Sequence, residues 1–302
     1  MMHVYGEIAA LLTSVCWAFN SVVFTRAGKR VGAVTVNYMR LWIAVPALLL
    51  IHWLLFGTPF PFDAGPRRFL YLGVSGLIGF VIGDTMLFES FLLIGPRLAM
   101  LLALLVPVVS SLLAWVFLGE KLLALEIASM LVTIGGIAWV VAERTARVDA
   151  LSFRQPQKYR LGILLAIGGA LGQAVGLLFS RLGLAGGYSA ISATLVRVSV
   201  SALALVIFGI FQGKIHAHLL KMKDKKALLE ITAGALTGPA LGVVLSLVAI
   251  AHAHIGVAST LMSLTPVFLL PVAHFLFREK ITSRAVIGTL IALMGVVLLF
   301  LI

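Results

Sequence analysis

The sequence predicts an all-α integral membrane protein of ten transmembrane helices, arranged as two inverted five-helix repeats. Three observations lead to this fold class. The chain carries few charged residues, its apolar residues gather in ten segments long enough to cross a bilayer, and its second half repeats parts of the first. The predicted units are a first repeat over residues 1–145, a connecting loop over 146–160 and a second repeat over 161–302.

The composition fits lipid better than water as the surrounding solvent. Hydrophobic residues make up 61% of the 302 residues and charged residues only 11%, whereas a soluble domain carries about 25% charged residues. The single cysteine, Cys16, excludes an internal disulfide framework. The basic residues behind the net charge of +12 lie in short loops between apolar runs. Their placement is explained by the orientation of the chain in a membrane, and it does not indicate a nucleic-acid partner.

Ten apolar segments are each close to the roughly 20 residues that a helix needs to span a bilayer. Glycine and proline clusters separate them, as at Gly95-Pro96. The runs are continuously apolar and do not alternate, which predicts helices and not a barrel. The predicted spans cover residues 6–24, 34–56, 70–93, 98–118, 124–142, 161–180, 191–211, 228–250, 257–277 and 285–302.

An internal repeat gives the organisation of the chain. The passage PVVSSLLAWVFLGEK begins at Pro107, and the similar passage PVFLLPVAHFLFREK begins at Pro266, an offset of 159 in the numbering. At an offset of 157, Arg40 falls on Arg197. Each repeat holds five spans, and because five is odd the second repeat must enter the bilayer upside down. Inverted repeats of this kind are common in secondary transporters.

These features resemble the EamA-type family of the drug/metabolite transporter superfamily. The resemblance rests on the two passages that begin with Pro-Val and end with Glu-Lys, on the loop Gly95-Pro96-Arg97 and on the arginine early in each second helix. It covers nearly the whole chain. It implies a ten-helix carrier of small metabolites such as amino acids or sugar derivatives, without naming the substrate.

Two predictions compete for the orientation of the chain in the membrane. Loops on the side of the N-terminus hold 4 Lys and Arg residues, and loops on the other side hold 17. The positive-inside rule then places both termini outside the cytoplasm, whereas the family resemblance implies that both lie inside. A reporter fused after Ile302 distinguishes the two.

Four formal charges lie well inside predicted helices: Arg40, Asp84, Glu89 and Arg197. A charge at the bilayer centre costs about 3 kcal/mol on insertion scales, so such residues should face a cavity or pair. We expect one of the two acids to pair with Arg40 and one, with Asp84 as first candidate, to face a central cavity and bind substrate or protons. The alternative is that all four form ion pairs that lock the helices together.

Small residues and prolines mark predicted helix contacts and gates. Glycines spaced four apart let helix backbones approach closely, either as static packing or as a sliding surface. Prolines inside apolar helices free a carbonyl and kink the helix. The residues assigned to packing or gating are Gly79, Gly83, Pro107, Gly238, Gly242 and Pro266.

Polar residues inside the spans are further candidates for a substrate cavity. Trp17 and Asn20 are three residues apart on the first helix, and Ser259 and Ser263 are four apart on the ninth. Gln173 lies on the sixth helix. Lipid or core packing of Trp17 and local bonding of the hydroxyls to the helix are the alternatives. The histidine pairs are poorly spaced as joint metal ligands, so no metal site is expected.

Three functions are compatible with this pattern. The first is a secondary transporter that moves a small metabolite, in the first instance an amino acid or related compound, across the cytoplasmic membrane by alternating access, with export as the expected direction. No phosphate-binding glycine loop is present, so the energy must come from a gradient of substrate or of an ion such as protons. The others are a scaffold or accessory subunit and, with less support, an intramembrane enzyme, for which no catalytic constellation is found. No cofactor is expected.

Overall fold

The protein is helical throughout the part that its structure, a computed structural model, describes: residues 2–119, 121–150, 156–252, 261–279 and 281–301. No strand occurs in these ranges. Eight helical segments are long and apolar enough to cross a membrane, and two shorter apolar helices, Thr265–Phe275 and Ser283–Leu299, follow them. The all-helical membrane fold is confirmed, and the total of ten spans stays a prediction.

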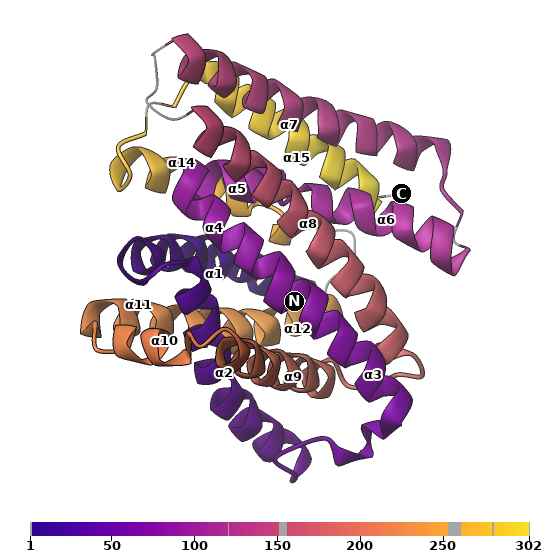
Figure 1. Ribbon diagram of the computed structural model, residues 1–302. Coiled ribbons are helices and arrows are strands. Elements are labelled where there is room, and N and C mark those ends of the chain that lie inside the picture. Colours follow the sequence, from indigo (N-terminus) through magenta and orange to yellow (C-terminus); the bar gives the residue numbers. More distant parts are fainter. Residues whose placement is uncertain (1, 120, 151–155, 253–260, 280, 302) are drawn as a thin grey trace.

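The first half contains the first five apolar segments (Figure 1). Its third segment is one continuous span in which a π-helical turn, η2, joins α3 to α4. Its fourth segment is interrupted at residues 103–104, between α5 and α6. The bounds are α1 Met2–Val31, α2 Ala33–Phe56, η1 Phe62–Ala64, α3 Gly65–Gly76, η2 Leu77–Gly83, α4 Asp84–Ile94, α5 Pro96–Leu102, α6 Leu105–Leu118 and α7 Ala124–Ala150.

The second half follows the same order of elements. A short helix, α10, lies between its second and third segments, and its third segment again contains a π-helical turn, η3. The bounds are α8 Pro156–Leu184, α9 Ala190–Phe211, α10 Ile215–Lys221, α11 Lys225–Ala235, η3 Leu236–Gly242, α12 Val243–His252, α14 Thr265–Phe275 and α15 Ser283–Leu301.

Each half has a proline shortly after a break in its fourth segment. Residues 103–104 precede Pro107, and the turn at 263–264 precedes Pro266. Proline lacks an N–H, so the carbonyl four residues earlier loses its helical partner. In the first half, the Ala103 carbonyl accepts instead from Val106 N at 3.0 Å, across three residues. The helix predicted as continuous over 98–118 is therefore interrupted, and so is the described part, 261–277, of the helix predicted over 257–277.

The two π-helical turns occupy equivalent places. Leu77–Gly83 and Leu236–Gly242 are each 7 residues long, and the repeat offset of 159 places one on the other. Such turns widen a helix by one residue and are frequent at functional sites. Pro239 lies in η3 and removes a backbone donor there, whereas Phe80 holds that position in η2. The same geometry thus arises from different residues in the two halves.

Equivalent helices of the two halves lie side by side and antiparallel, as α7 and α15 do in Figure 1. Gly136 of α7 lies against Ala292 of α15, and Thr133 lies against Gly295. Residue numbers rise along one helix while they fall along the other. The offset of 159 converts 136 into 295 and 133 into 292, so the two contacts are copies of each other.

The same reversal governs the other contacts between the halves. Helices α2 and α9 are antiparallel, because Tyr38 lies against Gly209 while His52 Nε2 lies 3.0 Å from Ser192 Oγ. Helix α8 packs along α3, η2 and α4, and α1 packs in the equivalent way along α11, η3 and α12. Reciprocal packing of this kind is what a two-fold axis between two halves produces.

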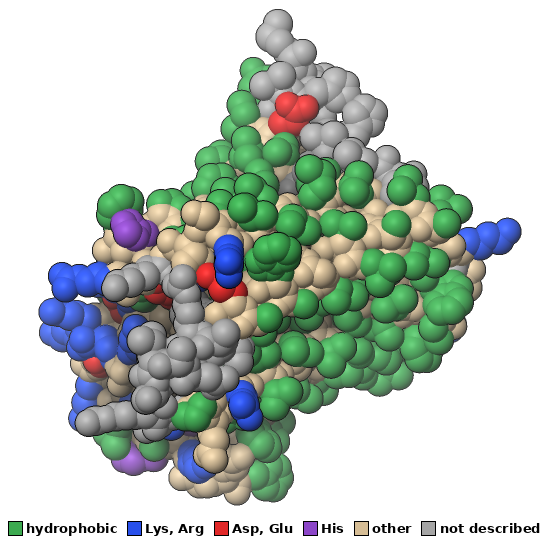
Figure 2. All heavy atoms as spheres, turned by 90° about the horizontal axis from the view of Figure 1, so that it is seen from above, with side chains coloured by type: hydrophobic (Ala, Val, Ile, Leu, Met, Phe, Trp, Pro, Cys, Tyr) green, Lys and Arg blue, Asp and Glu red, His purple; other side chains and the backbone are tan. Residues whose placement is uncertain are grey.

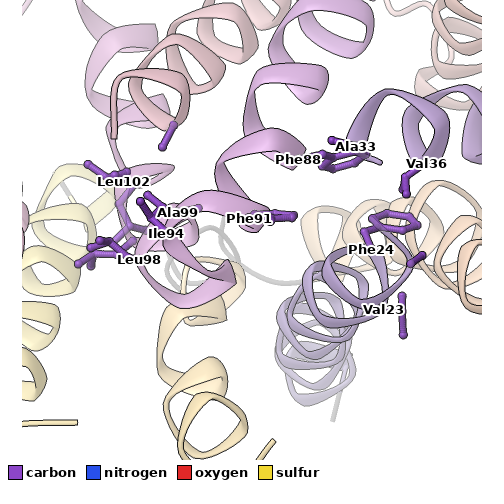
Figure 3. Close-up of a cluster of buried hydrophobic side chains, with 14 of the residues drawn as sticks. Val23, Phe24, Ala33, Val36, Phe88, Phe91, Ile94, Leu98, Ala99 and Leu102 are labelled. Carbon is purple, nitrogen blue, oxygen red and sulfur yellow. The ribbon is translucent and has the colours of Figure 1, made fainter. Parts of the chain in front are cut away.

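The largest buried apolar cluster lies near the C-terminal end of α1 and the N-terminal end of α5. The rings of Phe24 and Phe88 are 5.1 Å apart between centroids. Leu98 of α5 lies beside Ile94 at the end of α4 (Figure 3). Ile231 of α11 belongs to the same cluster, so residues from both halves close this end of the bundle.

Basic residues gather at one end of the molecule, while hydrophobic side chains cover much of the surface beside it (Figure 2). Arg26 and Arg30, near the end of α1, pair with Glu230 and Asp224 of the α11 region, each at 2.9 Å. The hydrogen bonds from Arg30 hold the pKa of the Asp224 carboxyl below its usual range. These pairs fix the end of α1 to the start of α11.

His218 of α10 anchors that short helix to α2. Its ring stacks on Tyr38 with centroids 5.1 Å apart, and its Nδ1 lies 2.9 Å from Thr35 Oγ1. Burial, followed by the charges of Lys221 and Lys214, holds the pKa of His218 below its usual value. The folded protein therefore favours the neutral imidazole.

We predict that Gly136→Ala destabilises the protein by about 1–3 kcal/mol, because the added Cβ clashes with the backbone of Ala292. Gly135→Ala is the matched control, since no atom lies within 4 Å of its added Cβ. Thermal unfolding of the purified protein measures both. Equal melting temperatures for the two variants would contradict the packing of α7 on α15.

A second prediction concerns pH. The unfolded chain binds a proton at His218 more readily than the folded chain, so protonation favours unfolding. Stability contributed by His218 is present above about pH 6.5 and is lost as the pH falls below that value. We expect His218→Gln to reduce the loss of Tm between about pH 7.5 and 5.5. His216→Gln, at an exposed position two residues earlier, should leave the loss unchanged.

Candidate functional site

The structure brings Arg40, Asp84, Gln173 and Arg197 together inside the bundle. Arg40 lies on α2, and Asp84 is the first residue of α4, directly after η2. Gln173 and Arg197 come from α8 and α9 of the second half. The cluster therefore joins both halves, and all three of its charged residues are buried.

Both carboxylate oxygens of Asp84 have donors. Arg40 Nη2 donates to Oδ2 in a close ion pair, and Gln173 Nε2 donates to Oδ1. Arg40 is itself oriented by Asn37, whose Oδ1 accepts from Arg40 Nε at 2.9 Å. Between the two acids named from the sequence, Asp84 is thus the one that pairs with Arg40.

The π-helical turn before Asp84 leaves carbonyls to be satisfied from outside the helix. Asn37 Nδ2 donates to Phe80 O at 2.8 Å, and Gln173 Nε2 donates to Gly79 O at 3.2 Å. In a membrane interior, unsatisfied backbone groups cost several kcal/mol each, so these amides stabilise the turn. Asn37 is a site residue that the sequence does not single out, because a lone amide near the start of a span gives no pattern.

Arg197 has a different environment from its repeat equivalent Arg40. Arg197 is only 9% exposed, yet no carboxylate of the described chain lies within ion-pair distance of it. Its Nε is buried without an acceptor there. The guanidinium carbon lies 4.4 Å from the ring centroid of Phe80, which also lies 5.8 Å from the guanidinium carbon of Arg40. Cation–π attraction contributes about 0.5–2 kcal/mol and cannot replace a counter-ion.

The other candidates lie apart from this cluster. Glu89 is partly buried and makes no ion pair or hydrogen bond with the described residues. Trp17 is 37% exposed and Asn20 is 3% exposed, so the two do not share an environment. Asn20 Oδ1 accepts from Thr237 Oγ1 at 2.8 Å, which makes Asn20 a neighbour of η3.

The serine pair predicted on the ninth segment is described only in part. Ser263 lies in the turn before α14, where the chain tightens ahead of Pro266, and Ser259 lies outside the described residues. No group of three or more His, Cys, Asp or Glu side chains in the described ranges could hold a metal ion.

Three of the predicted packing glycines, Gly79, Gly83 and Gly238, lie at close helix approaches. A Cβ added to Gly172 of α8 would lie 2.9 Å from the Cα of Gly83. A Cβ added to Gly238 would clash with the side chain of Asn20 from α1. The four glycines predicted from the sequence all belong to the π-helical turns: Gly79 and Gly83 to η2, Gly238 and Gly242 to η3.

Fold and site together define a polytopic helical membrane protein that holds a buried charge cluster between two equivalent halves. The model of the EamA-like transporter family matches residues 4–142 and, a second time, residues 160–301. The chain belongs to this family, and the resemblance based on its repeated passages is confirmed. The family also supports transport of small molecules across a membrane.

Solved structures support the same fold. One of the 21 matching chains, described as a crystal structure of a protein, is 17% identical in sequence with a TM-score of 0.60. The match covers 97% of this chain and 95% of that one. No curated protein matches the sequence.

We predict that the two equivalent arginines respond differently to removal. Arg40→Met leaves the Asp84 carboxylate buried without its ion pair and should lower the free energy of unfolding by about 3–5 kcal/mol. Arg197→Met removes a buried cation that has no ion pair and should cost less than about 1 kcal/mol or stabilise the protein. Thermal or denaturant unfolding measures both variants. A larger loss of unfolding free energy in Arg197→Met than in Arg40→Met would contradict the assigned ion pair.

Proposed function

We propose that the protein is a secondary transporter that moves a small metabolite, an amino acid or related compound, out of the cell across the cytoplasmic membrane by alternating access. The observation that carries the proposal is the charge cluster shared by the two family repeats: Asp84 and Arg40 from the first, Gln173 and Arg197 from the second. Buried ionisable residues in membrane proteins are costly and mark substrate or ion pathways.

The antiparallel pairing of equivalent helices supports alternating access. Two inverted five-helix halves can exchange conformations, so that a site between them opens to one side and then to the other. A single binding site at the repeat interface serves both conformations. The cluster around Asp84 lies at such an interface, because α2 and α4 meet α8 and α9 there.

One end of the bundle has features of a closed gate. Arg97 Nε of α5 lies 3.2 Å from Glu279 Oε2, with side-chain exposures of 7% and 15%. This ion pair joins the first half to the second. The aromatic contact between Phe24 and Phe88 and the side chain of Leu98 lie near the same helix ends. We assign this closed, basic end to the cytoplasmic side by the positive-inside rule.

Asp84 is the proposed proton site. Protonation would neutralise its carboxylate and weaken the ion pair with Arg40, which would free α2 from α4. Proton binding and helix movement would then be coupled through one side chain. A pH gradient could drive transport by this route.

The test is transport by the purified protein in liposomes with an imposed pH gradient and radiolabelled amino acids. Asp84→Asn should abolish gradient-driven transport, because the amide cannot exchange a proton. It should retain exchange of labelled for unlabelled substrate, which needs no net proton movement. Gradient-driven transport at the wild-type rate in Asp84→Asn would defeat the proton role.

The same liposomes distinguish the other roles. A scaffold or accessory subunit would carry none of the amino acids, nucleosides or sugar phosphates offered. An intramembrane enzyme would return a chemically altered compound. Movement of an unaltered compound that depends on the protein supports the transporter.

A further inference from the structure

The starting point is the hydrogen-bonding capacity of Arg197. A guanidinium has five N–H donors and is always charged, so a buried arginine normally has an anionic partner. Arg197 is buried at 9% exposure, its Nε has no acceptor in the described chain, and the Asp84 carboxylate, which attracts it, lies beyond ion-pair distance. A buried charged donor without a partner is costly, and functional sites are where such costs are found.

Comparison of the two repeats shows what Arg197 lacks. Arg40 has Asp84 as counter-ion and Asn37 as acceptor. At the equivalent positions the second half has Val243, at the offset of 159 from Asp84, and Thr194, at the offset of 157 from Asn37. Val243 is apolar, and the hydroxyl of Thr194 donates to the carbonyl of Ala190 in its own helix. The second half thus keeps the arginine without the acid.

The charge count of the cluster specifies a partner. Arg40 and Arg197 supply two positive charges and Asp84 supplies one negative charge, which leaves one positive charge over. One carboxylate brings the total of the cluster to zero, and in an amino acid the ammonium group would lie outside the cluster. A phosphate monoester, which carries close to two negative charges at neutral pH, would overshoot.

The groups around the Arg197 guanidinium are small, amide or apolar. Gly79 has no side chain, and a Cβ placed on it would lie 3.6 Å from both Arg197 Nη2 and Gln173 Oε1. The Phe80 ring lies at 4.4 Å from the guanidinium carbon. An arginine fork with an apolar ring beside it suits a carboxylate attached to an apolar group.

We infer that Arg197 binds the carboxylate of the transported molecule, so that the substrate supplies the counter-ion which Asp84 supplies to Arg40. The substrate class is a small molecule with a single free carboxylate, such as an amino acid with an uncharged side chain or a simple monocarboxylic acid. This assignment rests on the proposed transport function and names the part of the substrate that the site recognises.

The experiment measures the Tm of the purified protein with matched pairs of probes. The pairs are L-phenylalanine and its amide, L-leucine and its amide, and benzoate and benzamide, with inorganic phosphate as a separate arm. At about 100 times its Kd, a bound carboxylate should raise the Tm by about 5 °C. The amides and phosphate should leave it unchanged.

Three variants identify the residue responsible. Arg197→Met should remove the shift, and Arg197→Lys should weaken apparent affinity by about tenfold, because the ammonium lacks the planar fork. Arg284→Met, at an exposed arginine near the start of α15, should keep the full shift. If Arg197→Lys retains part of the carboxylate binding, Arg197 is a binding residue and not a purely structural one.

Four results would overturn the inference: a carboxylate shift that survives in Arg197→Met, amides that stabilise as well as the acids, stabilisation by phosphate alone, or no shift with any carboxylate. The measurement needs no liposome and no gradient. Carboxylate binding that depends on Arg197, without any transport, would refute the proposed function and keep the inference. Transport of compounds that lack a carboxylate would refute the inference and support the proposed function.

Discussion

A charge inside a membrane needs its counter-charge within the protein, and the ion pair between Arg40 and Asp84 is where this constraint acts most strongly here. The pair holds α2 to α4, and Gln173 ties α8 to the same carboxylate. The adjoining π-helical turn imposes a second demand of the same kind, because its carbonyls need donors. Asn37 and Gln173 meet it. The relative positions of three spans therefore depend on one acid and one irregular turn.

The two halves have the same order of helices and π-helical turns, and they differ in the side chains at equivalent positions. Pro239 lies within the turn in the second half, while side-chain amides from neighbouring helices support the corresponding turn in the first. Arg40 forms an ion pair with Asp84, whereas Arg197 has no carboxylate within ion-pair distance in the described chain, and Val243 stands at the position equivalent to Asp84. Duplication supplied the symmetric frame, and the loss of symmetry at a few positions gives the two halves unequal charges in the shared cluster.

Composition and periodicity predict the membrane fold because long apolar runs have few alternatives to spanning helices. The same reasoning locates Arg40, Asp84 and Arg197, since a charge in an apolar run is conspicuous. It does not reveal which acid Arg40 pairs with. The π-helical turns escape prediction because their carbonyls depend on donors from other helices, such as Asn37, and not on local sequence. The interruption of the helix ahead of Pro107 is predictable from the proline, and its particular hydrogen bonds are not.

The ion pair between Arg97 and Glu279 has a further consequence, because the repeat offset of 159 places Gly256 at the position equivalent to Arg97. An inverted repeat with identical halves would have two end states of equal free energy. Here an ion pair joins the halves at one end, and Gly256 has no side chain with which to form the equivalent pair at the other. Without substrate, the proposed transporter would then favour the conformation that is closed at this end. The opposite conformation would need the binding free energy of the substrate or of a coupling ion. The bias of the whole cycle would be set by a single arginine at the mouth of one half.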